Sequence, residues 1–138
     1  MRMRRSFGCD RGSSAVEFAL VAPLLLLFLS GLVDAGRAIW TYVGVQSAVQ
    51  EASTYAAYAP NDDAGIAARA VTGVDWPTLT SGDISVWCPD AGGENVSVSV
   101  RYDLALITPV VSQWLGGTIR LEKTVVARTV SSVRCDDG

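Results

Sequence analysis

The stretch "RGSSAVEFALVAPLLLLF", residues 11–28, decides the fold because it opens a helix that is long and apolar enough to cross a bilayer. No residue is charged over residues 18–33, and counting from Ser13 gives 21 residues. At about 1.5 Å per helical residue they cover roughly 31 Å, close to the hydrocarbon thickness of a membrane. A buried core helix is the alternative, but residues 24–29 are all Leu or Phe and leave no polar face. We therefore expect a transmembrane helix over residues 13–34.

A cleavable secretory signal is the second alternative for this segment. The letters "SGLVDAG", residues 30–36, resemble the small-residue cleavage site of such a signal only weakly. The helical pattern continues through them into a long amphipathic run rather than into a loop, so we favour a retained anchor.

Charge is distributed unevenly along the chain. Residues 1–12 carry four arginines against Asp10, and the rest carries seven basic and thirteen acidic residues. An acidic body lacks the clustered Lys and Arg that bind phosphate, which excludes a nucleic-acid partner. Basic residues flank the cytoplasmic side of a span, so the N-terminus is expected in the cytoplasm and the bulk of the chain outside it.

Three cysteines occur, at Cys9, Cys88 and Cys135. Cys9 lies on the basic side of the span, whereas the other two follow it, where an oxidising compartment would let them pair. We expect a disulfide between Cys88 and Cys135, which would contribute about 2 to 4 kcal/mol. Two free buried thiols are the alternative.

Glu17 is the one acidic residue inside the apolar segment. A carboxylate within the bilayer costs about 2.5 to 3.5 kcal/mol on insertion scales, so such residues are usually functional and paired. The alternative is that Glu17 lies near the headgroups and reaches water.

The residues around Glu17 resemble a type IV prepilin cleavage site, in which a basic leader ends in Gly12 and Glu17 and Phe18 are the fifth and sixth residues after it. More closely, "RGSSAVEFALVAPLLLL" followed by "GLVDAGRAIW" resembles the opening of the TadE-like family, minor pilins or pseudopilins of the tight-adherence (Flp) pilus system. The motif covers about residues 11–40, and TadF-like chains share it.

The resemblance implies that a prepilin peptidase cuts after Gly12, removing the basic leader of residues 1–12 together with Cys9. Ser13 then becomes the N-terminus, and its amine in a neighbouring subunit neutralises Glu17, with Phe18 beside it in the assembly motif. Further implied partners are other pilin and pseudopilin subunits, an assembly platform in the bacterial inner membrane, and membrane lipid.

Beyond the span the helical rhythm continues over residues 35–59. Apolar residues recur every three or four positions and predict one face of an amphipathic helix: Ile39, Tyr42, Val45, Val49, Ala52, Ala56 and Ala59. We therefore expect one helix over residues 13–59, kinked at Pro23 and ended by "PNDDAG" at residues 60–65.

Residues 60–138 predict a small extracytoplasmic α+β domain. A short helix capped by Asp62 or Asp63 runs to about Val71; a metal site at this acidic pair is the alternative.

Strands follow at residues 84–88 and 96–102, joined by a turn at residues 89–95. Thr108 and Pro109 then begin a short helix that Gly116 ends, and a last strand from Thr118 shows a bulge at Val125 and Val126. The expected fold is α+β and pilin-like: a long N-terminal helix packed on a small antiparallel sheet.

The composition argues against an enzyme. Histidine is absent, which excludes Ser-His-Asp and Cys-His arrangements and most catalytic zinc sites. A Ser-Lys pair at the sole lysine, Lys123, has no marked partner. We expect no cofactor and no metal. The scattered residues Trp40, Trp76, Trp87 and Trp114 are interpreted as core or interface aromatics rather than a ligand cage.

Two functions from different classes remain. The first is a processed pseudopilin that acts as a structural component in assembling an adhesive surface pilus. The second is an uncleaved, membrane-anchored extracytoplasmic binding module whose helix is only a tether. Gly12 together with Glu17 favours the first.

Overall fold

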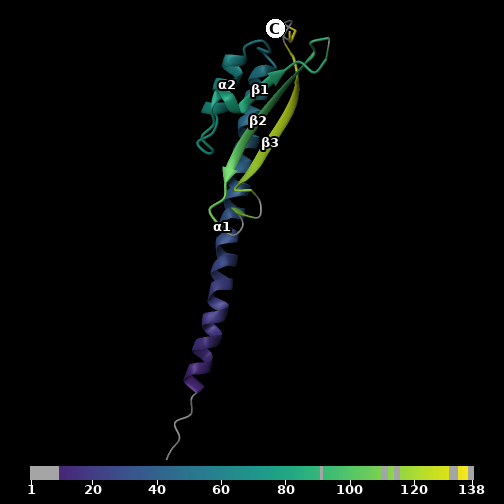
Figure 1. The fold of residues 1–138 in the computed structure, drawn as a ribbon. Helices are drawn as coiled ribbons and strands as arrows, with labels where there is room; N and C mark the ends of the chain where they lie inside the picture. The colour runs from purple at the N-terminus through teal and green to yellow at the C-terminus, as the bar shows by residue number, and fades with distance from the viewer. Residues whose placement is uncertain (1–9, 91, 110–111, 114–115, 131–133, 137–138) are drawn as a thin grey trace, which may run out of the picture.

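The computed structural model describes residues 10–90, 92–109, 112–113, 116–130 and 134–136, with side chains from Ser14 onward. A helix, α1 (Asp10–Ala56), extends along the molecule, and a small head covers its C-terminal half (Figure 1). The elements of the head are α2 (Asp63–Thr72), the short 3₁₀ helix η1 (Ser81–Asp83), β1 (Ile84–Trp87), β2 (Asn95–Ala105) and β3 (Thr118–Arg128). This arrangement confirms the expected α+β fold.

The C-terminal half of α1 forms one side of the core. Its buried side chains recur at helical spacing and are mostly small: Val45, Ala48, Val49, Ala52 and Ala56. Alanine lets a sheet lie close to a helix, and β2 and β3 both pack against this stripe. The helix ends at Ala56, three residues before the expected end. Ala59 precedes Pro60, and the residue before a proline is disfavoured in the helical conformation, so the chain turns out of the helix here.

The covered stripe of α1 differs from the predicted face at its lower end. Ile39 is 67% exposed and Tyr42 is also exposed, whereas Thr41, which is not part of the predicted apolar face, is fully buried. The cause is the loop after α2, because the indole Nε1 of Trp76 donates a hydrogen bond to Thr41 Oγ1 at 3.2 Å. A contact from the head, rather than hydropathy, therefore selects the buried side at this turn.

The sheet is antiparallel with the strand order β1-β2-β3. Central strand β2 contributes Val96, Val98 and Val100 to the core, all fully buried. Strand β3 pairs with β2 along its whole length, from Asn95↔Arg128 to Ala105↔Thr118, without a change of register.

The bulge expected at Val125 and Val126 is therefore wrong. Lys123 takes an inward position between Leu121 and Val125, so the alternation continues and Val126 is exposed. Lys123 interrupts the alternation of apolar and polar residues in the sequence, but the strand itself continues through it in the same register.

A capping contact begins α2, as predicted. Asp62 is the N-cap, and its Oδ1 accepts a hydrogen bond from the Gly65 backbone N–H at 3.0 Å. Its Oδ2 accepts a second bond, at 2.7 Å, from the hydroxyl of Tyr55 at the end of α1. Asp62 therefore joins the two helices while it caps one of them.

The far end of the head holds the turn between β1 and β2 against the C-terminal segment. Cys88, immediately after β1, forms a disulfide with Cys135. Gly93 in the turn has a φ of +63°, and its carbonyl accepts a hydrogen bond from the Cys135 N–H at 3.0 Å. The turn and the chain end therefore form one unit.

Part of the helix expected after Thr108 is described. Pro109, Ser112 and Gln113 are helical, and the Ser112 N–H donates to the Thr108 carbonyl at 2.9 Å, as an N-cap position requires. Residues 110–111 and 114–115, Trp114 included, lie outside the described residues.

Candidate assembly segment of the long helix

The N-terminal half of α1 leaves its apolar side chains uncovered. From Ser14 to Val33 the described side chains are exposed or half-buried, and Figure 1 shows this half extending away from the head. Its most exposed large apolar side chains are Phe18, Leu20, Leu24, Leu26 and Phe28. Among the described residues, α1 is the one helix that is long and apolar enough to cross a membrane. A contiguous exposed apolar surface of this kind is typical of a segment that contacts lipid or another protein.

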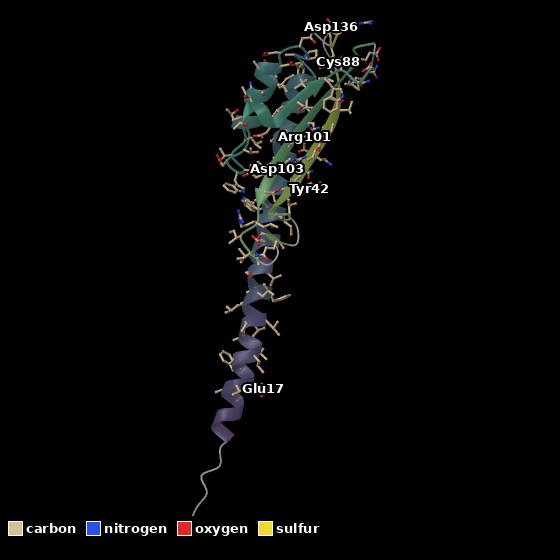
Figure 2. The ribbon with its side chains drawn as sticks, in the orientation of Figure 1. Glu17, Tyr42, Cys88, Arg101, Asp103 and Asp136 are labelled. Carbon is tan, nitrogen blue, oxygen red and sulfur yellow. A yellow bond between two sulfur atoms is a disulfide. The ribbon has the colours of Figure 1, made fainter. Side chains whose placement is uncertain are left out.

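Glu17 lies near the lower end of this exposed half (Figure 2), and Phe18 follows it in the chain. Both side chains are exposed, Phe18 by 70%. Within the described part of the chain Glu17 makes no ion pair, and its neighbours one turn along the helix, Leu20 and Val21, are apolar. Among the described side chains the carboxylate has no counter-charge, and its apolar neighbours are typical of a residue within a membrane.

Gly12 and Ser13 lie in the first turn of α1, which begins at Asp10. A glycine inside a helix costs about 1 kcal/mol relative to alanine, because it loses more backbone freedom. The first turn is therefore a weak part of the helix, and the Gly12–Ser13 bond lies in it.

Asp34 marks the boundary between the exposed and the covered halves of α1. Its side chain is only 5% exposed. Its two carboxylate oxygens accept hydrogen bonds from the backbone N–H groups of Ile107, at 3.0 Å, and Thr108, at 2.8 Å. Arg37, one turn later, contacts the same carboxylate at 3.4 Å and donates to the Ala105 carbonyl at 3.3 Å. We call these contacts the Asp34 clamp.

The Asp34 clamp was missed in the sequence. A local signal existed, since Asp34 ends the uncharged run and Arg37 follows at the spacing of an ion pair on one helix face. The amides that the carboxylate binds come from residues more than seventy positions further along the chain, however. No local pattern identifies such partners.

The remaining predicted site, the Cys88–Cys135 disulfide, lies at the end of the molecule opposite Glu17 (Figure 2). A hollow of about 180 Å³ beside it is lined by residues that include Pro60, Asp63 and Trp87. The predicted assembly residue Glu17 and the disulfide therefore lie far apart in the structure. In the part of the chain that is described, no group of three or more acidic or cysteine side chains is placed to hold a metal ion.

The fold and the exposed segment together define a class: proteins with a single long N-terminal helix, apolar and uncovered in its first half and packed on a small antiparallel sheet in its second. The family model for TadE-like protein matches residues 12–54, about a third of the chain, which confirms the resemblance seen in the sequence. The matched residues include Glu17, the Asp34–Arg37 pair and most of the covered stripe. No curated protein and no solved structure matched the chain. The long helix is therefore similar to that of TadE-like proteins, and its length and apolar composition suit it to anchoring the chain in a membrane.

Proposed function

We propose that this chain is a minor pilin or pseudopilin, a structural component rather than an enzyme, that acts in the assembly of a tight-adherence (Flp) pilus. A prepilin peptidase removes residues 1–12, and the helix then packs among other pilin helices in the inner membrane. The observation that carries the proposal is the exposed apolar half of α1, with Glu17 lacking an ion pair within the described chain.

The chemistry of Glu17 supports a partner from another subunit. A buried ion pair roughly breaks even in free energy, whereas a buried carboxylate without its partner is strongly unfavourable. The freed amine of Ser13 in a neighbouring subunit would satisfy Glu17 only when two helices are in one relative position. The pair would therefore fix the register of assembly more than it would add stability.

The proposed topology puts the N-terminus in the cytoplasm and the head on the periplasmic side of a single span. The four arginines of the leader support this orientation. The Cys88–Cys135 disulfide in the head supports it as well, because such bonds persist in oxidising compartments.

Processing is tested by the intact mass of the protein extracted from membranes of cells that carry the pilus machinery. We expect the mass of a chain that starts at Ser13. A full-length mass would support the alternative function, an uncleaved membrane-anchored binding module, and would remove the amine that the proposal requires.

Assembly is tested by Glu17→Gln, which keeps the size of the side chain and removes its charge. We expect normal recovery in the membrane fraction and at least a tenfold loss of co-purification with pilin subunits in mild detergent. Glu51→Gln is the matched control, since Glu51 is an exposed carboxylate on the covered half of the same helix. Wild-type co-purification by Glu17→Gln would count against the proposal.

A further inference from the structure

Two tryptophans that are distant in sequence lie together immediately beyond the exposed half of α1. Trp40 of α1 is 68% exposed and Trp76 of the loop after α2 is 43% exposed. Both line an open groove of about 510 Å³ together with Val33, Gly36 and Arg37. We propose that Trp40 and Trp76 form a membrane-interface patch, occupied by the phospholipid headgroup layer of the bilayer in which α1 is anchored. The inference rests on the proposed membrane span and goes beyond the proposed function.

Trp76 is held in place although much of its ring is exposed. Its Nε1–H donates to the buried Thr41 Oγ1 at 3.2 Å. Its carbonyl oxygen lies so close to Gly44 that a side-chain carbon at position 44 would overlap it. The next residue, Pro77, is buried. The head therefore fixes the backbone and one edge of this indole and leaves the remaining ring surface facing outward.

The groove adjoins the apolar half of α1, which favours lipid as its occupant. Side chains on a helix lean toward its N-terminus, so the indole of Trp40 leans toward the apolar half of α1. Val33, the last residue of the uncharged run, lines the same groove. Trp40 is seven positions after Val33, about 10 Å further along the helix axis, and an ordinary tilt of about 20° brings one side of the helix closer to the membrane. The patch is thus continuous with the surface that lipid would already cover.

The chemistry of the groove matches the headgroup layer. An indole combines a large apolar ring with one N–H donor, and tryptophan is enriched where hydrocarbon meets water. Arg37 lines the groove and keeps about a third of its side chain exposed beside the Asp34 clamp. A guanidinium there is suited to lipid phosphate. Ser47 and Asp75, which line the adjoining hollow further up, are in turn suited to water.

The test uses the full chain in phospholipid vesicles, labelled with 5-fluorotryptophan and observed by 19F NMR. Single Trp→Phe substitutions assign the four native resonances. A lipid that carries a nitroxide near its headgroup broadens nearby signals, and a water-soluble paramagnetic agent reports exposure to water. Trp87 is the internal control, because it is 40% exposed but lies beside the disulfide at the far end of the head. The substitution Phe28→Trp adds a span reporter, a fifth indole within the exposed half of α1.

We expect the lipid nitroxide to broaden Trp40 and Trp76 at least threefold more than Trp87, and the soluble agent to show the reverse. Equal broadening of Trp76 and Trp87, with the span reporter strongly affected, would overturn the patch while leaving the span intact. An unaffected span reporter would contradict the span itself. If Trp40 and Trp76 were shielded from both agents, increasingly so at higher protein-to-lipid ratio, a second copy would fill the groove and the lipid assignment would be wrong.

Discussion

Asp62 connects α1 and α2 because its two carboxylate oxygens each accept a hydrogen bond. Protonation of the carboxyl group would weaken this pair of bonds. The Tyr55 hydroxyl and then the Gly65 N–H lower the pKa of this carboxyl below its usual 3.8, although partial burial acts in the opposite direction. The same contact raises the pKa of Tyr55 above 10.0. Because the pKa is lower in the folded chain than in the unfolded chain, the stabilisation is fully present above pH 3.8 and is lost as the pH falls through the folded value.

The first prediction follows from this sign. Asp62→Ala should lower the midpoint of urea unfolding in nonionic detergent at pH 7, and the gap between wild type and variant should narrow as the pH is lowered below 3.8. Asp63→Ala, at the neighbouring position in the first turn of α2, is the control and should have a smaller effect. A gap that stays constant with pH would show that the charge of Asp62 does not contribute.

Gly93 is required for two independent reasons. Its φ of +63° is strained for any residue with a side chain, and a side-chain carbon there would lie 2.6 Å from the Cys135 carbonyl oxygen. Gly93→Ala should therefore lower the free energy of unfolding by about 1 to 3 kcal/mol in urea titrations. Gly92→Ala is the matched control, because its added carbon would meet its nearest neighbour, a side-chain oxygen of Asp90, at 3.4 Å. Equal losses for the two variants would contradict the argument.

At the scale of elements, hydropathy patterns predicted most of the fold. The uncharged run indicated the exposed half of α1, and the alternation of Val96, Val98 and Val100 indicated the central strand. The pattern failed at Lys123 and at Thr41, where a neighbouring element rather than the side chain's own polarity sets its position. Sequence spacing alone could not bring Trp40 to Trp76 or Asp34 to Thr108, because those contacts depend on how the head folds back on α1.

The disulfide connects the end of β1 to the C-terminal segment across 47 positions. Closing a loop of this length restricts the unfolded chain, and removing the bond should lower the free energy of unfolding by about 2 to 5 kcal/mol. We expect this loss in the double variant Cys88→Ser and Cys135→Ser relative to the wild type, when both are unfolded in urea without reductant. Adding reductant should bring wild type to a similar value, and an unchanged wild type under reductant would contradict the prediction.

At the scale of the whole molecule, the Asp34 clamp fastens the lower edge of the head to α1. Asp34→Asn replaces a carboxylate that accepts two backbone hydrogen bonds with a group that has one acceptor oxygen. Hydrogen exchange at the amides of Ile107 and Thr108 should accelerate at least tenfold, as followed by mass spectrometry in detergent. The amides of β1 at the other end of the head should be unchanged, and uniform acceleration would indicate global destabilisation instead.

The exposed segment and the part of the core next to the sheet belong to one continuous helix, α1. Motion of the exposed segment is therefore transmitted to the head. Its 47 residues correspond to a rod about 70 Å long. Leaning such a rod by ~10° about its base carries the top sideways by roughly 12 Å. Pro23, the one residue of α1 that cannot donate a backbone hydrogen bond, lies in the exposed half, so any flexing there occurs below the Asp34 clamp. A push or pull on the lower half would therefore move the head as a rigid body.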